Sequence, residues 1–228
     1  MRPSGLVIAV DGPSGAGKST AAQALALSLG YTFIDTGAMY RALALKALRA
    51  EACLDDETAL AGLLAGTAIR LTDGGRGVEL DGEDVSQAVR TRELSAAASR
   101  VSVHARVRRE MVARQQQLGR QGGVVLDGRD IGSAVFPDAE VKFYLDADPA
   151  ERARRRHAEL RERGIAADLA EIEREIRERD LKDTTRGDSP LTRVPGALLV
   201  DTTRLTPDQV VEAMLAAVRR RQHSPAPA

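Results

Sequence analysis

The sequence predicts an α/β protein in which helices flank a central parallel sheet of five strands. Short apolar runs alternate along the chain with longer segments whose apolar residues recur at helical spacing. The first run, residues 6–10, leads through a glycine-rich turn straight into a segment rich in Ala and Leu. Strands that are separated by helices form parallel sheets, because each helical crossover lets the next strand run in the same direction.

The predicted strands are short and apolar, which is typical of strands that helices cover on both faces. They are residues 6–10, 31–34, 123–127, 141–147 and 197–201. Helices are expected at residues 18–29, 37–51 and 91–121, the last with a break near Val103 and His104. Three further helix starts show a capping residue followed three positions later by Glu or Gln, and these capping residues are Asp148, Asp168 and Thr206.

A different pattern occupies residues 56–90, where a short helix is followed by two strand candidates and tight glycine-rich turns. We therefore expect a small β-containing insertion. With 228 residues, one α/β unit carrying such an insertion is the simpler prediction than two independent domains. The end of the chain, residues 223–228, is rich in Pro and is expected to be disordered.

Composition argues against several classes of protein. The formal net charge is +0, so there is no general attraction to nucleic acid or to an anionic membrane. Cys53 is the single cysteine, so an intrachain disulfide cannot form. No apolar segment approaches the ~20 residues that are needed to cross a bilayer, and the first run is too short for a signal peptide. We expect a cytoplasmic protein with neither nucleic acid nor a membrane as its partner.

Residues 12–19, GPSGAGKS, match the pattern G-x-x-x-x-G-K-[ST] of a phosphate-binding loop, or P-loop. A predicted strand precedes the loop and a helix follows it, so its backbone N–H groups and the helix N-terminus would both face phosphate oxygens. Lys18 would reach the terminal phosphates, and Ser19 or Thr20 could hold Mg²⁺ directly or through water. The expected phosphate-binding residues are Gly12, Pro13, Ser14, Gly15, Ala16, Gly17, Lys18, Ser19 and Thr20.

The loop alone does not distinguish a kinase from an ATPase or a GTPase, so the arginines matter. The chain lacks the Asn-Lys-x-Asp segment with which a switch GTPase reads guanine. In VVLDGRD, residues 124–130, Arg129 follows a strand end, where open parallel sheets bind their ligands. Its guanidinium suits an anionic substrate better than a site devoted to Mg²⁺. Further arginines crowd residues 106–109 and 152–156, for which a solvated helix face is the competing explanation.

The chain resembles bacterial cytidylate kinases in four successive segments, which are IAVDGPSGAGKST, DTGAMYRALAL, LDGRDIGSAVFPDAEVKFYLDA and RDLKDTTRGDSPL. These enzymes phosphorylate CMP and dCMP with ATP. The resemblance extends over nearly the whole chain, and the P-loop together with the DGRD segment makes it specific. It implies the nucleoside-monophosphate (NMP) kinase fold, phosphoryl transfer to a phosphate acceptor, and ATP with Mg²⁺.

The resemblance also implies three parts within a single kinase unit. The core would comprise about residues 1–60, 91–150 and 187–222. An NMP-binding insertion would occupy about residues 61–100, and a helical lid about residues 151–167.

Several positions match family residues that bind CMP or act in phosphoryl transfer. The group implied to contact the acceptor phosphate is Thr36, Arg41 and Arg129. The group implied to read the cytosine edge is Ser99, Arg108 and Asp130. The group implied to meet the sugar and phosphate region is Arg179, Asp183 and Arg186. The residues expected to be catalytic are Lys18, Arg129, Arg186 and, from the lid, Arg155.

Two positions depart from the common family pattern. Thr36 stands where serine is frequent, which keeps the hydroxyl, and Ser19 stands where glycine also occurs, which would allow direct ligation of Mg²⁺. Asp127 has two open roles, since it could organise the water around Mg²⁺ or pair with an arginine.

Two alternative functions stay open at this level. The acceptor could be UMP or AMP, although the insertion and the DGRD segment favour CMP and dCMP. A non-catalytic, nucleotide-regulated RNA-binding protein is less favoured, because the chain has only 3 Phe, 3 Tyr and no Trp with which to stack bases. With small molecules as its partners, the protein is expected to be a monomer.

Overall fold

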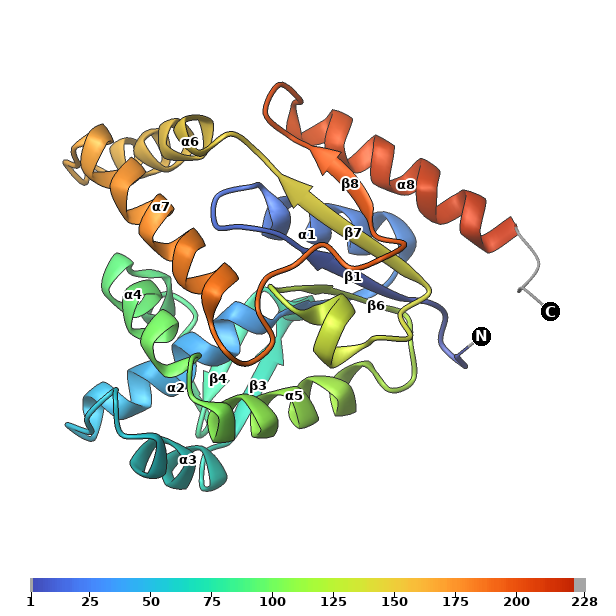
Figure 1. Ribbon diagram of the computed structural model, residues 1–228. Helices are drawn as coiled ribbons and strands as arrows, with labels where there is room; N and C mark the ends of the chain where they lie inside the picture. The colour runs from blue at the N-terminus through green and yellow to red at the C-terminus, as the bar shows by residue number, and fades with distance from the viewer. Residues whose placement is uncertain (1, 224–228) are drawn as a thin grey trace.

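The computed structural model describes residues 2–223 and contains a five-stranded sheet at its centre (Figure 1). The strand order is β2-β6-β1-β7-β8, and every neighbouring pair is parallel. The strands are β1 Val7–Asp11, β2 Thr32–Asp35, β6 Val124–Asp127, β7 Val141–Asp146 and β8 Leu198–Asp201. The predicted fold class and all five predicted strands are therefore confirmed.

Three of the helices begin at the predicted capping residues Asp148, Asp168 and Thr206. The helices are α1 Lys18–Leu29, α2 Thr36–Arg49, α3 Glu57–Ala65, α4 Arg92–Val101, α5 Ala105–Gly119, α6 Pro149–Glu162, α7 Leu169–Thr185 and α8 Pro207–His223. Asp148 accepts hydrogen bonds from the first N–H groups of α6, and Asp168 does so for α7. The predicted break near His104 is confirmed, since α4 ends at Val101 and α5 begins at Ala105. Apart from His223, the predicted tail lies outside the described residues.

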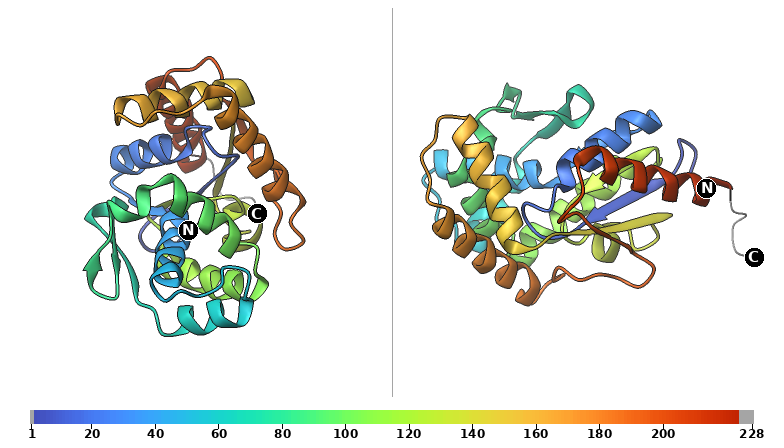
Figure 2. Two further views of the ribbon diagram at one scale, coloured as in Figure 1. Left: turned by 90° about the vertical axis from the view of Figure 1, so that its left-hand side faces the viewer. Right: turned by 90° about the horizontal axis from the view of Figure 1, so that it is seen from above.

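The two faces of the sheet are covered differently. Helices α1 and α8 pack side by side on one face, where Leu25 and Met214 meet Ile8 and Phe143 of the strands (Figure 2). On the other face Val7 and Leu126 contact a single π-helical turn, η3 Ile131–Val135. The central strands β1 and β6 are buried at every position, which explains their continuous apolar runs, whereas the edge strand β8 leaves Leu198 and Leu199 exposed.

A second, antiparallel sheet lies between α3 and α4 in the chain. It consists of β3 Ile69–Thr72, β4 Gly77–Leu80 and β5 Glu83–Asp84, with 3₁₀ turns η1 Asp73–Gly75 and η2 Ala88–Arg90 beside it. Val78 and Leu80 pack on Ala38 and Ala42 of α2. This small sheet fits the β-containing insertion expected from the sequence, while the boundaries drawn for the insertion stay a prediction.

Helices α6 and α7 form a separate pair with its own apolar contact, made by Ala153, Leu160, Ile172 and Ile176. The pair lies beside the carboxyl ends of the strands, and α7 runs close to α4 (Figure 1). Arg92 at the start of α4 forms ion pairs with Glu175 and, at 3.3 Å, with Glu171 of α7. The elements on either side of the site are therefore in contact.

Each of the five parallel strands ends in an aspartate. These residues are Asp11, Asp35, Asp127, Asp146 and Asp201. Because parallel strands end at the same edge of a sheet, the pattern gathers carboxylates where ligands bind in this fold class. Each carboxylate accepts a hydrogen bond from a nearby loop or helix start. The aspartates therefore hold in place the loops and helix starts at this edge of the sheet.

Candidate active site

A groove of about 1960 Å³ lies at the carboxyl ends of the strands, bounded by the P-loop and helices α2, α4, α6 and α7. The structure brings together there most of the residues expected to form the site. They are Ser14, Gly15, Ala16, Gly17, Lys18, Ser19, Thr20, Thr36, Arg41, Ser99, Arg108, Arg129, Asp130, Arg155, Arg179, Asp183 and Arg186. Gly12 and Pro13 do not line the groove.

The P-loop follows β1 and ends in the N-terminus of α1, as its sequence pattern requires. Gly12 has φ +145°, and a side chain there would bring Cβ to 1.9 Å from the carbonyl oxygen of Leu145. Gly12 therefore acts beneath the loop, where only glycine fits. Pro13 contributes its carbonyl oxygen, which accepts a hydrogen bond from Lys18 Nζ at 2.7 Å.

Lys18 is buried, and its charge is costly in this structure. Burial, together with the positive charge of Arg129, lowers the pKa of Lys18 to about 7. A lysine in this position is ready to take up a proton when an anion enters the groove, since a nearby negative charge favours the ammonium form.

The start of α1 is tied to the end of β6. Ser19 Oγ donates a hydrogen bond to Asp127 Oδ2, and Thr36 Oγ1 donates to the main-chain oxygen of Asp127 at 2.6 Å. Burial and the negative charge of Asp35 raise the pKa of Asp127. A hydroxyl and a carboxylate side by side are oxygen ligands of the kind that Mg²⁺ accepts. Within residues 2–223 no three His, Cys, Asp or Glu side chains are grouped to hold a metal ion on their own.

Two arginines surround a single carboxylate beside the P-loop. Arg129 Nε donates to Asp183 Oδ2 at 2.9 Å, and Arg179 Nε lies 4.0 Å from the same oxygen. Burial opposes ionisation of Asp183, but Arg129 and Arg179 outweigh it and hold the pKa of this carboxyl below its ordinary value. Burial and repulsion from Arg129 lower the pKa of Arg179 to about 10. The cluster carries more positive than negative charge and therefore attracts anions.

A second cluster lies further along the groove. Arg108 of α5 is buried and forms an ion pair with Asp130, which follows β6 in the DGRD segment. Arg186 Nη2 lies 3.6 Å from the other oxygen of Asp130, while its Nε donates to the main-chain oxygen of Ser189 at 2.8 Å. Ser99 also lines the groove, from α4. The three residues expected to read a base are thus collected from three separate elements.

Donor groups in the groove are left without acceptors. The Nε atoms of Arg41, Arg108 and Arg179 are buried and make no hydrogen bond to any of the described residues. Each of these side chains also lines the groove. Carboxylate oxygens lie 3.7 Å from the Nε of Arg108 and 4.0 Å from that of Arg179, too far for a hydrogen bond. Buried polar groups almost always have hydrogen bonds, so three arginines that line one groove and each keep an Nε–H without one indicate a site for an anionic, acceptor-rich ligand.

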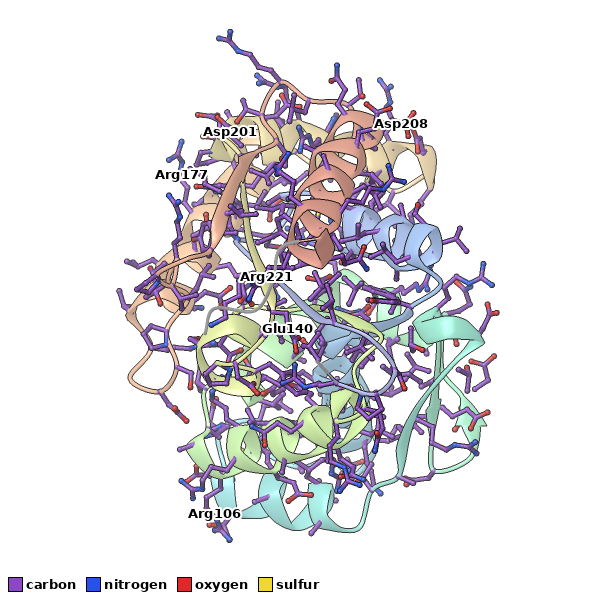
Figure 3. All side chains as sticks on the ribbon, turned by 90° about the vertical axis from the view of Figure 1, so that its right-hand side faces the viewer. Arg106, Glu140, Arg177, Asp201, Asp208 and Arg221 are labelled. Carbon is purple, nitrogen blue, oxygen red and sulfur yellow. The ribbon has the colours of Figure 1, made fainter. Side chains whose placement is uncertain are left out.

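The arginine clusters of the sequence are separated by the fold. On α5, Arg108 is buried whereas Arg106 is exposed, and Figure 3 shows Arg106 pointing outward from the molecule. On α6, Arg155 lines the groove and donates from Nη1 to Thr202 Oγ1 at 3.1 Å, while Arg154 is exposed. Position on the helix, rather than residue type, decides which arginine reaches the site.

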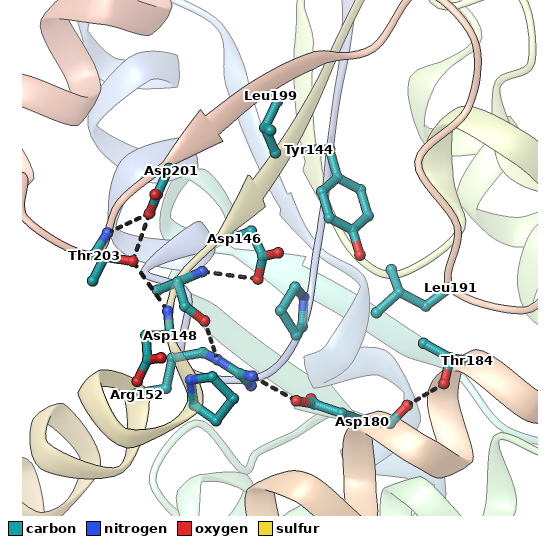
Figure 4. A pocket seen from close by; sticks show the side chains of 13 residues that line it. Tyr144, Asp146, Asp148, Arg152, Asp180, Thr184, Leu191, Leu199, Asp201 and Thr203 are labelled. Carbon is teal, nitrogen blue, oxygen red and sulfur yellow. Dashed lines mark hydrogen bonds and ion pairs between the residues drawn. The ribbon is translucent and has the colours of Figure 1, made fainter.

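Three residues outside the predicted catalytic and binding set support the site. Asp35 accepts a hydrogen bond from Ala38 N at the start of α2 and pairs with Arg41 at 2.9 Å. Arg152 is buried and donates to Asp180 at 2.6 Å, as Figure 4 shows, and to Ser14 O at 3.0 Å, so it links the P-loop to α7. Asp11 bonds to the turn that follows Asp130. Asp11 and Asp35 could have been found from the sequence, because an aspartate ends every strand of the parallel sheet.

A P-loop at the head of a parallel α/β sheet, facing a groove with unpaired arginine donors, defines a P-loop phosphotransferase. The comparison with known families makes this more specific, because the family model "Cytidylate kinase" matches residues 8–220. The chain belongs to the cytidylate kinase family. The predicted resemblance is confirmed.

Similar proteins named cytidylate kinase occur in several bacteria. The protein of Syntrophotalea carbinolica is 51% identical over 219 residues, which cover 95% of this chain and 93% of that protein. The protein of Symbiobacterium thermophilum is 51% identical over 218 residues, covering 94% of this chain and 96% of its own. A Geobacillus protein is 49% identical over 216 residues, with 94% and 96% covered.

Proposed function

We propose that this protein transfers the terminal phosphoryl group of ATP to CMP and dCMP, with CDP and dCDP as products. The observation that carries the proposal is a set of three arginines, Arg41, Arg108 and Arg179, that line the groove containing the P-loop and whose buried Nε–H groups make no hydrogen bond. A nucleoside monophosphate supplies both a phosphate and a hydrogen-bonding base. One such ligand would satisfy donors in both arginine clusters.

The donor nucleotide would bind at the P-loop. Backbone N–H groups of Gly15 and Gly17 and the N-terminus of α1 would face its phosphates, and Lys18 would become fully charged against them. Mg²⁺, which neutralises charge on the transferring phosphates, would be held by Ser19 and Asp127 together with nucleotide oxygens and water.

The acceptor phosphate would lie between Arg41 and Arg129. A phosphate monoester has its second pKa near 6, so it is largely a dianion at neutral pH and needs no general base. Arg129, Arg179 and Lys18 would offset the repulsion between this dianion and the donor. Thr36 would add a hydroxyl contact, and Arg186 would meet the sugar and phosphate region with Asp183.

The base would be read by the second cluster. Cytosine has an exocyclic amine that donates, and a carbonyl oxygen O2 and a ring nitrogen N3 that accept, which suits Asp130 as acceptor and Arg108 and Ser99 as donors. Uracil replaces the amine with an acceptor and carries a proton on N3. A pocket built for cytosine would leave groups unpaired, at a cost of about 1–3 kcal/mol for each.

Residues 151–167, which comprise most of α6 and the loop after it, would form the lid, and Arg155 is the lid arginine that we expect to reach the transferring phosphate. In the structure Arg155 pairs with Glu151 and bonds to Thr202, so it would exchange those partners when ATP is bound. Closure of such a lid excludes water that could otherwise hydrolyse the donor.

The proposal is tested with a panel of acceptors. Purified protein with ATP and Mg²⁺ is assayed for ADP release with CMP, dCMP, UMP, AMP and no acceptor. We expect CMP and dCMP to give the highest kcat/KM and ADP release to be slight without an acceptor. A higher kcat/KM with UMP or AMP would replace the proposed substrate, and ADP release without any acceptor would indicate an ATPase.

A further inference from the structure

Asp11 connects the two halves of the groove without lining it. It is the last residue of β1, directly before the P-loop, and is 5% exposed. Its Oδ1 accepts a hydrogen bond from Ile131 N and its Oδ2 accepts one from Gly132 N, both at 2.8 Å. The carboxylate of Asp11, next to the P-loop, therefore accepts hydrogen bonds from two successive main-chain N–H groups just after Asp130.

These two N–H groups belong to the first two residues of the turn that follows Asp130. Residues Ile131–Val135 form a single π-helical turn, and the first N–H groups of a helical turn have no partner within it. Asp11 supplies both acceptors. Gly132 permits this approach, because a Cβ atom at that position would lie 3.3 Å from Asp11 Oδ2 and 3.1 Å from Lys142 Cδ.

The contact is unusual among the strand-end aspartates. Asp35, Asp146 and Asp201 each accept a main-chain hydrogen bond from residues that directly follow their own strand, as Figure 4 shows for Asp146 and Asp201. Asp11 instead reaches residues 120 and 121 positions later in the sequence. Asp127 at the end of the neighbouring strand β6 makes the reverse connection, to Ser19 of α1. The aspartate that ends β1 thus binds the segment after β6, and the aspartate that ends β6 binds the helix after β1.

Orientation of Asp130 depends on this arrangement. The main chain of Asp130 is held on its carboxyl side by Asp11 through Ile131, while its side chain meets Arg108 and Arg186. A charged acceptor holds two N–H groups more strongly than a neutral one. Loss of one acceptor oxygen would let the turn shift relative to β1, and the carboxylate of Asp130 would move with it.

We infer that Asp11 is a positioning residue that holds Asp130 in place for the acceptor base, and that it thereby sets the preference for cytosine over uracil. The inference rests on the proposed function, since it assigns Asp130 to the base. Asp11 touches neither substrate and acts through the turn at residues 131–132.

The variant Asp11→Asn tests the inference, because it keeps the size of the side chain and removes one of the two acceptors. We expect the ratio of kcat/KM for CMP to kcat/KM for UMP to fall about five- to tenfold, the effect of weakening the contact of Asp130 with the base by about one ordinary hydrogen bond. The KM for ATP should change less than about twofold, which a general loss of structure would not spare. Asp146→Asn is the matched control, since it alters a strand-end aspartate that bonds only to the adjacent Ala147 N, and its ratio should stay at the wild-type value.

Two further variants separate positioning from a structural role. Gly132→Ala places a methyl group against Asp11 without changing a charge, and it should lower the same ratio. This variant takes the place of Asp11→Asn if that protein cannot be purified folded. In the Asp130→Ala background, Asp11→Asn should lower the ratio no further, because the residue through which it acts is gone.

The inference is overturned if Asp11→Asn keeps the wild-type ratio, if it raises the KM for ATP as much as the KM for CMP, or if the two substitutions are additive. These outcomes are distinct from failure of the proposed function, which wild-type protein alone would reveal by lacking activity with CMP.

Discussion

Arg129 at the end of β6 donates from Nε to Oδ2 of Asp183 near the end of α7, at 2.9 Å and across 54 residues of sequence. The bond ties the DGRD segment to the helix that packs against α6. A change in the contacts of Arg129 would therefore be transmitted to α7. Asp183 also limits the repulsion between Arg129 and Arg179, which allows two guanidinium groups to face one anion.

Replacement of Arg129 by Ala removes a charged donor from the expected acceptor phosphate. We expect kcat/KM for CMP to fall roughly 10- to 100-fold, because a hydrogen bond to a charged group contributes about 1.5–3 kcal/mol. Steady-state kinetics measure the change. The control is Arg177→Ala, which alters an exposed arginine of the same region that Figure 3 shows pointing outward. Near-normal turnover of CMP by Arg129→Ala would contradict the assigned role.

Replacement of Asp130 by Ala should relax base preference more than it lowers turnover. Uracil no longer meets a carboxylate at the position of its O4, so the ratio of kcat/KM for CMP to that for UMP is expected to fall about tenfold. Because buried Arg108 would lose its hydrogen-bonded carboxylate and keep only that of Asp188, 3.7 Å from its Nε, stability should also fall. Asp130→Asn keeps the shape of the side chain, so thermal melting of both variants separates the two effects. An unchanged ratio in folded protein would exclude Asp130 from base recognition.

Binding of ATP should be accompanied by proton uptake at Lys18. The pKa of this lysine is lowered to about 7 in the structure, mainly by burial, and phosphate charge would raise it again. Uptake should therefore be large at about pH 8, where the free side chain is mostly neutral, and small at about pH 6. Calorimetry in buffers of different ionisation enthalpy measures it. Lys18→Arg stays charged throughout, so equal uptake by this variant would disprove the assignment.

Asp11 should make stability depend on pH in a defined window. Burial outweighs its two backbone hydrogen bonds and raises its pKa from 3.8 to about 6. The folded state then binds a proton more readily than the unfolded state between these values, so the contribution of Asp11 to stability is full at low pH and is lost as pH rises through about 6. The free energy of unfolding of wild type, relative to Asp11→Asn, should decrease across that window. A constant difference would show that the pKa is not raised.

Mg²⁺ dependence should respond to Asp127. Removal of divalent cations is expected to abolish transfer, and Asp127→Asn should raise the Mg²⁺ concentration for half-maximal activity about tenfold, since it removes a negative charge next to Ser19. Titration of Mg²⁺ at fixed ATP measures this. Asp201→Asn, at the end of the edge strand, is the control, because Asp201 bonds to Thr203 and does not line the groove. An unchanged Mg²⁺ requirement in Asp127→Asn would place the ion elsewhere.

Local pattern was sufficient for the secondary structure and for the donor half of the site. Helix α1 begins and ends where the residue pattern predicts, and the break between α4 and α5 falls near His104 as expected. These features are determined by neighbouring residues, since capping, apolar periodicity and a glycine-rich loop all act within a few positions of the chain. The P-loop belongs to this class because its glycines, Lys18 and the start of α1 are contiguous.

In the acceptor half, Arg129 could be proposed from its place after a strand end, but the residues expected to read the base could be proposed only through family resemblance. Arg106 and Arg109 do not differ from Arg108 in local pattern, yet Arg108 alone of the three is buried and pairs with Asp130. Which arginine faces the groove depends on how α5 packs against the sheet, and that orientation follows from apolar contacts made by residues distant in the chain.

By itself the sequence determined that this chain is a parallel α/β protein with a P-loop, because strands, helices and the loop each follow from short-range pattern. Only the tertiary structure decided that Asp11 serves the turn after Asp130, that Ser19 meets Asp127, and that Arg129 meets Asp183. These pairs are separated by more than fifty positions. A buried charge is stable only beside a partner, and the partner is chosen by which strand ends and helix starts the folded sheet brings together.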